Sequence, residues 1–258
     1  MSTGFARALA ERAAADYADF LLPHLEPDFR VLDVGCGSGT ITLGLARTVS
    51  EVVGVDLDDE FADARHYAEK HNLANVDFQV GDVYALGFPT DHFDACLCHS
   101  MLETLDRPLD GLVEIGRVLK PGGVVGVASV EYGGLIVAGP ESEQLERFYA
   151  IRERLWLLEN AGDPYRGREL RGLVERAGFE RVTAMSKYFC YGTLKAVEAF
   201  GLARADDCQD PWYSESAKKH GLATYDDLVA LSLAWREWSV SPDAYAAFAW
   251  CSAVGWKR

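Results

Sequence analysis

The chain lacks long apolar runs, and this shortage argues against membrane-spanning and exported proteins. None of its apolar stretches approaches the roughly 18 residues that a helix needs to cross a bilayer. Charged side chains also interrupt the apolar residues near the N-terminus, at Arg7, Glu11, Arg12, Asp16 and Asp19. The segment therefore lacks the uninterrupted apolar core of a signal peptide. We expect a cytoplasmic protein.

Basic residues are also scarce. Lysine and arginine number 25 against 40 aspartates and glutamates, which gives a formal net charge of -15. A negative surface repels a phosphate backbone, and no cluster of lysine and arginine supplies a local basic groove. We therefore expect no nucleic-acid partner. The oligomeric state stays open, with a homodimer among the options.

The six cysteines form neither a CxxC pair nor a metal-ligand spacing. Reduced thiols and the absence of a metal site are the expectation for a cytosolic protein of this kind. The chain also lacks repeats and linkers rich in proline, glycine or serine. We therefore interpret residues 1–258 as a single domain.

Short apolar segments alternate with helical segments along most of the chain. The predicted strands cover 30–34, 51–57, 76–80, 94–98, 124–129, 181–190 and 247–257, and the predicted helices cover 40–49, 58–72, 108–119, 141–160 and 167–177. This alternation predicts an α/β fold with a doubly wound, mostly parallel, seven-stranded sheet. In such a sheet, ligands bind outside the carboxyl ends of the strands.

Two further helical segments surround this core in the sequence. Residues 5–22 have apolar residues at spacings of three and four, which predicts an amphipathic helix that ends at Pro23. We interpret residues 1–25 as an N-terminal helical cap. Residues 193–240 also have helical character and precede the last strand, so we expect a helical lid inserted there.

The segment VLDVGCGSGT, at residues 31–40, is the most informative part of the sequence. A strand ends at Val34 and a helix follows, so Gly35, Gly37 and Gly39 fall in a tight turn. Without side chains, this turn lets a ligand lie against the backbone.

Two residues argue against a nicotinamide cofactor in this turn. The dinucleotide fingerprint needs glycine or alanine where this chain has Thr40. The negative charge of Asp33 would also repel a pyrophosphate, whereas it would attract an ammonium group. A nicotinamide oxidoreductase is therefore disfavoured.

Five segments together resemble class I S-adenosylmethionine-dependent methyltransferases, especially the group related to ubiquinone and menaquinone biosynthesis. They are VLDVGCGSGT, VVGVDLD, GDV, FDACLCHSMLETLDRP and LKPGGVVGV, which match in order and spacing. The resemblance implies a Rossmann-like fold and S-adenosylmethionine as the cofactor, released as S-adenosylhomocysteine.

The resemblance also implies which residues bind the cofactor. Gly35 and Gly37 would contact its methionine part through their backbone, with Asp33 near the amino group. Asp56 would accept hydrogen bonds from the ribose hydroxyls. The residues expected around the adenine are Leu57, Asp82 and Val83. The alternative for Asp56 and Asp82 is a structural role as a helix N-cap.

For the reaction, the resemblance implies an SN2 transfer of the sulfonium methyl to a nucleophile of a small molecule. Oxygen, nitrogen and carbon are candidate nucleophiles, and secondary metabolites or quinone-like compounds are candidate acceptors. The catalytic candidates are His99, Glu131 and Tyr17, because they occur on the first helix or after the fourth and fifth strands. Histidine accepts a proton near neutral pH.

Several of these residues have a structural alternative. Tyr17 could instead be a core residue of the first helix, and Glu131 could be a surface residue. We expect Glu103 to be an exposed helix residue. Gly133 and Gly134 would let the backbone pass close to a ligand. Arg166 and Arg168 suit either an anionic substrate or a solvated helix start, and we expect Trp212, Trp235 and Trp238 to fill the core of the lid.

A second function stays open from the sequence. A cyclase or eliminase that uses the sulfonium as a fixed positive charge would carry the same cofactor motifs.

Overall fold

The computed structural model describes residues 13–159 and 162–258. These residues form two compact units. The first, here the sheet unit, contains residues 13–130, 165–186 and 251–258, and the second, here the helical unit, contains residues 131–159, 162–164 and 187–250. Residues 5–12 of the predicted N-terminal helix lie outside the described part of the chain.

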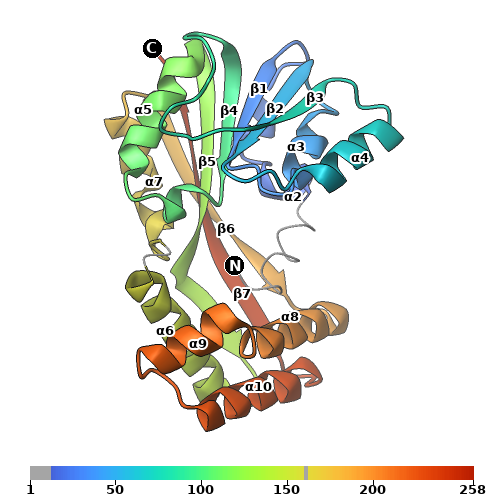
Figure 1. The fold of residues 1–258 in the computed structure, drawn as a ribbon, viewed down its shortest axis with the longest axis vertical. Helices are drawn as coiled ribbons and strands as arrows, with labels where there is room; N and C mark the ends of the chain where they lie inside the picture. The colour runs from blue at the N-terminus through green and yellow to red at the C-terminus, as the bar shows by residue number, and fades with distance from the viewer. Residues whose placement is uncertain (1–12, 160–161) are drawn as a thin grey trace. The chain divides into compact units, whose positions relative to one another are not determined.

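A seven-stranded sheet with the order β3-β2-β1-β4-β5-β7-β6 runs through the described residues. Its strands are β1 (Arg30–Val34), β2 (Glu51–Asp56), β3 (Val76–Val80), β4 (Phe93–His99), β5 (Leu119–Ala138), β6 (Glu180–Tyr191) and β7 (Tyr245–Trp256) (Figure 1). The pairs β1–β2, β2–β3, β1–β4 and β4–β5 are parallel.

The pairing of β7 differs from that of these strands. Gly122 N donates to Lys257 O, and Lys257 N donates to Gly123 O. The start of β5 therefore lies beside the end of β7, which makes these two strands antiparallel. The predicted doubly wound, mostly parallel sheet is confirmed.

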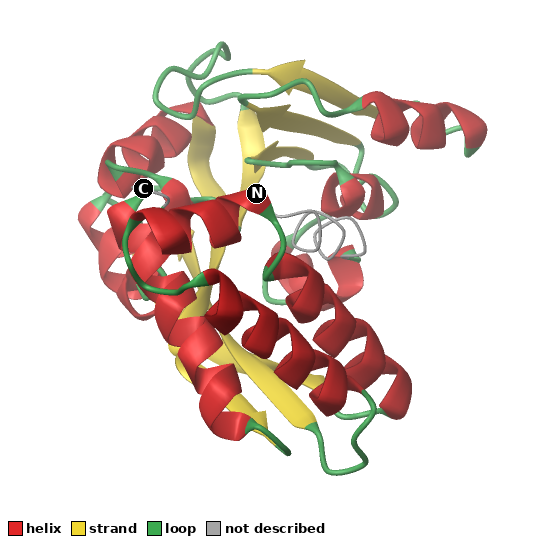
Figure 2. Cartoon of the chain, turned by 60° about the horizontal axis from the view of Figure 1, so that its bottom comes forward, coloured by secondary structure: helices red, strands yellow, loops and turns green. Residues whose placement is uncertain are grey.

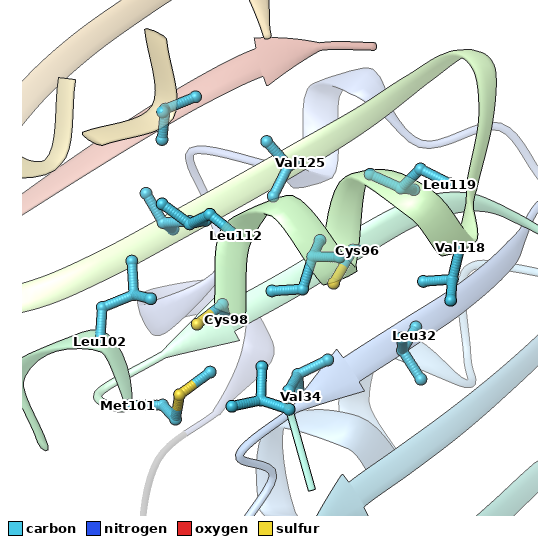
Figure 3. Packing of buried hydrophobic residues seen from close by; sticks show 14 of the residues in the cluster. Leu32, Val34, Cys96, Cys98, Met101, Leu102, Leu112, Val118, Leu119 and Val125 are labelled. Carbon is cyan, nitrogen blue, oxygen red and sulfur yellow. The ribbon is translucent and has the colours of Figure 1, made fainter. Parts of the chain in front are cut away.

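Alternate side chains of the strands pack against helices on the two faces of the sheet unit. On one face, Leu32 and Cys96 pack against α5 (Pro108–Val118) and α7 (Leu170–Arg176). Figure 3 shows this cluster, in which Leu112 and Val118 of α5 lie over the strands. Each fully buried leucine or valine stabilises the fold by about 1.5–3 kcal/mol.

The opposite face packs against α2 (Ala14–Tyr17) and α3 (Thr40–Leu45) through Val31, Leu97 and their neighbours. A smaller cluster joins α4 (Ala62–Lys70) to Phe78 of β3. All six cysteines are free thiols. None of the helices in the described part of the chain is long and apolar enough to cross a membrane.

The N-terminal segment departs from the predicted amphipathic helix. Its described part is helical only over α2, and a single 3-10 turn, η1 (Leu22–His24), follows. Between them the chain turns so that Phe20 and Leu21 are buried. Gly126 makes this possible, because a Cβ there would lie 3.0 Å from the Leu21 side chain. Packing against the sheet thus overrides the helical spacing.

β5 is longer than predicted. The strand was expected to end at residue 129, whereas it continues to Ala138. The pair Gly133 and Gly134 therefore lies inside a strand. At Gly134 a Cβ would lie 2.4 Å from the Cβ of Ala249, so this glycine permits close packing against β7.

Four helices belong to the helical unit, namely α6 (Ser142–Leu158), α8 (Leu194–Asp207), α9 (Pro211–Lys219) and α10 (Tyr225–Ser239) (Figure 2). The last three follow β6 and precede β7 in the chain, and each begins at a side-chain cap. The caps are Thr193, Asp210 and Thr224, which accept hydrogen bonds from backbone N–H groups of the first turns.

Two of the three tryptophans that were expected to fill the core of the lid are fully buried. Trp235 and Trp238 of α10 are fully buried, and Trp212 of α9 is half-buried. Trp235 and Trp238 belong to a set of contacting aromatic rings that includes Phe200 and Phe248, whereas the Trp212 ring lies under the Arg152 guanidinium.

Candidate functional site

The glycine loop after β1 has three residues in the left-handed region. Gly35, Gly37 and Gly39 have φ values of 73°, 52° and 76°. A Cβ on Gly35 would collide with Met101, and one on Gly39 would collide with Phe78. A Cβ on Gly37 would meet nothing within 4 Å. The backbone at Gly37 is therefore open on the side where a ligand would lie.

Asp33 lies in β1, two residues before this loop, and is only 2% exposed. Its Oδ2 accepts a hydrogen bond of 2.7 Å from Thr42 Oγ1 of α3. Burial raises the pKa of Asp33 from its ordinary value of 3.8 to about 7; the Thr42 hydroxyl opposes this shift and the nearby Asp56 carboxylate adds to it. A cation beside Asp33 would favour the charged form.

Asp56 ends β2 and connects it to the glycine loop. One carboxylate oxygen accepts a 2.7 Å hydrogen bond from Gly37 N, and the other accepts a 2.8 Å bond from Leu57 N. Gly35 N also donates to Val55 O. The residue is half-buried, and each carboxylate oxygen can accept a further hydrogen bond. Hydroxyl groups are suitable partners for them.

The expected adenine residues are distributed over two loops. Leu57 is 66% exposed, an apolar side chain with little protein packed around it. Asp82 follows β3, and its Oδ1 accepts a hydrogen bond from Tyr84 N. This bond forms an Asx-turn. No helix begins at Asp82, so the residue is not the helix N-cap that was its alternative. Val83 packs its side chain into the core of the sheet unit.

His99 is the last residue of β4, and it is buried. Its imidazole contacts the Tyr17 ring of α2 in an edge-to-face arrangement, with centroids 5.5 Å apart. Ser100 follows with a φ of 60°, and its N–H donates to Ala128 O. The structure thus brings together two of the three catalytic candidates, which lie far apart in the sequence.

Glu103 corrects a sequence expectation. It was expected on an exposed helix surface, whereas it lies in the 3-10 turn η2 (Leu102–Thr104) and is only 2% exposed. Ser129 of β5 donates a 2.6 Å hydrogen bond to Glu103 Oε2. The turn is drawn inward because Met101 and Leu102 pack into the core beside it.

Glu131, the third catalytic candidate, belongs to the helical unit. It is buried within β5, so the prediction that it stands at a strand end is wrong. Its Oε1 accepts a hydrogen bond from Gly133 N. Arg166 and Arg168 lie in the 3-10 turn η3 (Arg166–Glu169), where Arg166 pairs with Glu169 and Arg168 stacks over Tyr165.

Sequence reasoning missed Thr42, Met101 and Ser129. Thr42 holds Asp33, Met101 packs against Gly35, and Ser129 holds Glu103. The signal for Ser129 was its place at the carboxyl end of a predicted strand. Met101 and Thr42 carry no such signal, because each acts through a contact with a residue on another element.

The carboxyl edge of the sheet unit suits a ligand that combines positive charge, vicinal hydroxyls and an aromatic base. It offers the buried Asp33, the Asp56 carboxylate, the open backbone of Gly37 and the exposed Leu57. S-adenosylmethionine has an ammonium, a sulfonium, a ribose and an adenine. The residues present therefore fit this cofactor.

Several known proteins are similar to this chain in sequence. A family model described as "Methyltransferase domain" matches residues 32–127. A demethylmenaquinone methyltransferase from Lysinibacillus sphaericus is 30% identical over 176 residues, which are 62% of this chain and 73% of that protein. An uncharacterized methyltransferase from Schizosaccharomyces pombe is 28% identical over 243 residues, which are 89% of this chain and 84% of that protein.

The fold is shared with solved structures. The YcgJ protein from Bacillus subtilis matches with a TM-score of 0.61 at 19% identity, over 95% of this chain and 99% of that one. The resemblance found in the sequence motifs is thereby confirmed. The chain belongs to the class I methyltransferases, which depend on S-adenosylmethionine.

Proposed function

We propose that the protein transfers a methyl group from S-adenosylmethionine to an oxygen, nitrogen or carbon nucleophile of a small molecule. The observation that carries this proposal is the open backbone at Gly37, which stands beside the carboxyl groups of Asp33 and Asp56. Bound S-adenosylmethionine would supply a methyl group already activated by the sulfonium. The acceptor remains to be found among small molecules such as secondary metabolites and quinone-like compounds.

In this proposal, residues of the three loops after β1, β2 and β3 hold the cofactor, together with Asp33 of β1 and Asp56 of β2. The backbone of Gly35 and Gly37 lies along its methionine part, and Asp56 accepts hydrogen bonds from the ribose hydroxyls. Leu57 covers the adenine ring, as its exposed apolar side chain suggests. Asp82 and the backbone of Val83 remain proposed contacts for the adenine edge, although the Asp82 side chain already accepts a bond from Tyr84 N.

Asp33 has a defined electrostatic role in this arrangement. Its carboxyl group is buried, and its pKa of about 7 leaves much of it neutral at pH 7 without a ligand. An ammonium group nearby stabilises the carboxylate and lowers this pKa. Cofactor binding is then accompanied by release of a proton from Asp33.

On the acceptor side, we propose His99 as the base and Tyr17 as the residue that orients it. Their rings are in contact, and both lie in the sheet unit. Removal of a proton is needed when the nucleophile is a hydroxyl or a carbon acid, and alignment in a dry site supplies most of the remaining rate. Glu131 is the other candidate for the base.

We also propose that residues 193–240 act as a lid within one methyltransferase domain, together with the N-terminal cap of residues 1–25. The support is that α8, α9 and α10 form an insertion between β6 and β7 in the chain. Closure of such a lid excludes water and orders the reacting groups.

The proposal is tested by methyl transfer itself. Purified protein is incubated with S-adenosylmethionine labelled in its methyl group and with a panel of phenolic, quinone-like and polyketide acceptors. Transfer of label to one acceptor class, with matching release of S-adenosylhomocysteine, supports it. If the protein converts a compound of the panel into a product that carries no label, the protein instead belongs with the cyclases or eliminases that use the sulfonium only as a fixed positive charge.

The stability of the unliganded protein depends on Asp33 and pH. The pKa of this carboxyl is raised in the folded state, so the folded protein binds more protons than the unfolded chain between about pH 4 and pH 7. The contribution of Asp33 to stability should therefore fall as the pH rises through this window.

Asp33→Asn removes the free-energy cost of a buried carboxylate and keeps an oxygen that can accept the hydrogen bond from Thr42. We expect the variant to be more stable than wild type above pH 7, on the order of 2–4 kcal/mol, with the difference vanishing near pH 4. Urea unfolding across this range measures it. Asp59→Asn, at an exposed surface position, is the control and should follow wild type. Parallel pH profiles for wild type and Asp33→Asn would contradict the raised pKa.

The variant His99→Gln tests whether His99 is the catalytic base. Glutamine keeps a hydrogen-bonding side chain but cannot take the proton, so kcat on the true acceptor should fall about 100-fold and the acid limb of the pH profile should disappear. His66→Gln, on the exposed side of α4, is the matched control. Turnover within about threefold of wild type, with an unchanged pH profile, would make Glu131 the leading candidate.

A further inference from the structure

The last helix of the helical unit exposes a row of residues with the spacing of a coiled-coil seam. In α10, the residues Asp226, Val229, Leu233 and Arg236 follow one another at intervals of three and four, and Val240 continues the row at the C-cap. Alternating intervals of three and four place residues along one side of a helix, as the a and d positions of a heptad do. These five residues are here called the α10 seam.

The α10 seam is open to solvent along its whole length. Leu233 and Val240 are 61% and 75% exposed, and the other three residues are exposed as well. Single apolar residues are common on protein surfaces, whereas a contiguous apolar row is the kind of patch that marks an interaction site.

The opposite side of α10 anchors the helix in its unit. Trp235 and Trp238 are fully buried there. Ser232 Oγ donates a 3.0 Å hydrogen bond to Ala205 O of α8, the helix that lies beside α10 (Figure 1). The helix also begins with a capping box at Thr224. The seam is therefore already ordered, and binding a partner costs little further ordering of the backbone.

The residues of the seam are complementary to a second copy that runs antiparallel. A two-fold axis level with Leu231 places Val229 of one copy opposite Leu233 of the other, because both lie two residues from the axis. The same axis places Asp226 opposite Arg236, since both lie five residues from it. Each copy thus contributes both members of every pair, as an isologous interface requires. The result is an apolar centre with an ion pair at each end.

Charge decides against two other occupants of this surface. A parallel second copy would place Asp226 against Asp226 and Arg236 against Arg236, which is unfavourable because like charges repel. Helices that lie on membranes have polar faces rich in lysine and arginine. The only basic residue of α10 is Arg236, and the chain has a net charge of -15. An antiparallel second copy is the occupant that these charges fit.

Arg236 is held at the edge of the seam by its own chain. Its Nη2 lies 3.3 Å from Asp206 Oδ1 of α8, and both side chains are exposed. An exposed pair of this kind contributes little to stability. A guanidinium has five N–H donors, so the same side chain can also donate to Asp226 of a second copy.

We propose that the α10 seam is a self-association surface through which two copies of the chain form an antiparallel, two-fold symmetric dimer. Val229 and Leu233 of both copies pack in the centre, and Asp226 pairs with Arg236 at both ends. Such a contact is small, so the dimer forms in the micromolar range and is in equilibrium with the monomer. The proposal goes beyond methyl transfer and does not depend on it.

Sedimentation equilibrium of the full chain at about 150 mM salt tests the dimer. Between about 1 μM and about 500 μM, the wild type should convert from monomer to dimer. Leu233→Asp places two unpaired carboxylates in the centre of the interface, so this variant should dimerise at least about 100-fold more weakly. Because Leu233 is exposed, the dilute variant should melt at the same temperature as dilute wild type.

Leu157→Asp is the matched control. Leu157 lies on α6 of the same unit and is 59% exposed, nearly the same as Leu233. This substitution adds the same charge outside the α10 seam. Its dimerisation constant should stay within about twofold of wild type.

Exchange of the charges tests the antiparallel register. Asp226→Arg and Arg236→Asp each place like charges opposite one another at both ends, so each variant alone should dimerise at least about tenfold more weakly. In an equimolar mixture of the two variants, every facing pair again has opposite charges, and a mixed dimer should form with an affinity within about threefold of wild type. Asp226→Arg also makes the net charge less negative, so general repulsion predicts the opposite result for it.

The proposal is overturned if the wild type stays monomeric over this range, if Leu233→Asp associates as wild type does, or if Leu157→Asp weakens association as much as Leu233→Asp. Single charge variants that dimerise like wild type, or a mixture that stays monomeric, would also contradict it. Vesicles of equal parts phosphatidylcholine and phosphatidylserine should leave the wild type in the supernatant, and binding that Leu233→Asp abolishes would show a membrane occupant instead. None of these measurements uses a methyl acceptor, so failure of the proposed function is distinguishable from failure of the dimer.

Discussion

The hydrogen bond from Gly37 N to the Asp56 carboxylate is the interaction on which the cofactor site depends. It ties the loop after β1 to the end of β2, the neighbouring strand in the sheet. The same carboxylate accepts the N–H of Leu57, so one side chain shapes both loops. The left-handed conformation at Gly37 is available because the residue has no Cβ. This bond therefore fixes the positions of the backbone groups that a ligand would contact in either loop.

Burial of Asp33 is the second constraint on this edge of the sheet. A carboxyl group inside the fold without a cation costs free energy at neutral pH, and the Thr42 hydroxyl offsets only part of that cost. The site is therefore less stable alone than it would be with an asparagine at this position. Such a cost is typical of a site built for a charged ligand rather than for maximal stability.

Most of the sheet unit could be predicted from the sequence. β1 and β3 begin and end at the predicted residues. β1 is recognisable as a short, mostly buried apolar run, and β3, at the edge of the sheet, as an alternation of apolar and polar residues in which Phe78 is buried. The glycine loop and Asp56 were recognisable because their chemistry depends on local sequence and spacing. The long second half of β5 was not, because Gly133 and Gly134 suggest a turn until β7 packs against them.

Residues whose role depends on a distant partner were beyond sequence reasoning. Glu103 looks like a surface residue until Ser129 of another strand binds it. Tyr17 and His99 approach each other only because the chain turns after α2 and returns to the sheet.

Calorimetric titration with S-adenosylhomocysteine tests the central claim most directly, namely that Asp56 and the glycine loop form the cofactor site. Asp56→Ala is compared with Asp59→Ala, an exposed position three residues away whose ion pair with Arg65 contributes little. The account predicts that Asp56→Ala stays folded and binds about 1–3 kcal/mol more weakly, while Asp59→Ala matches wild type. An unchanged dissociation constant for a folded Asp56→Ala would contradict it.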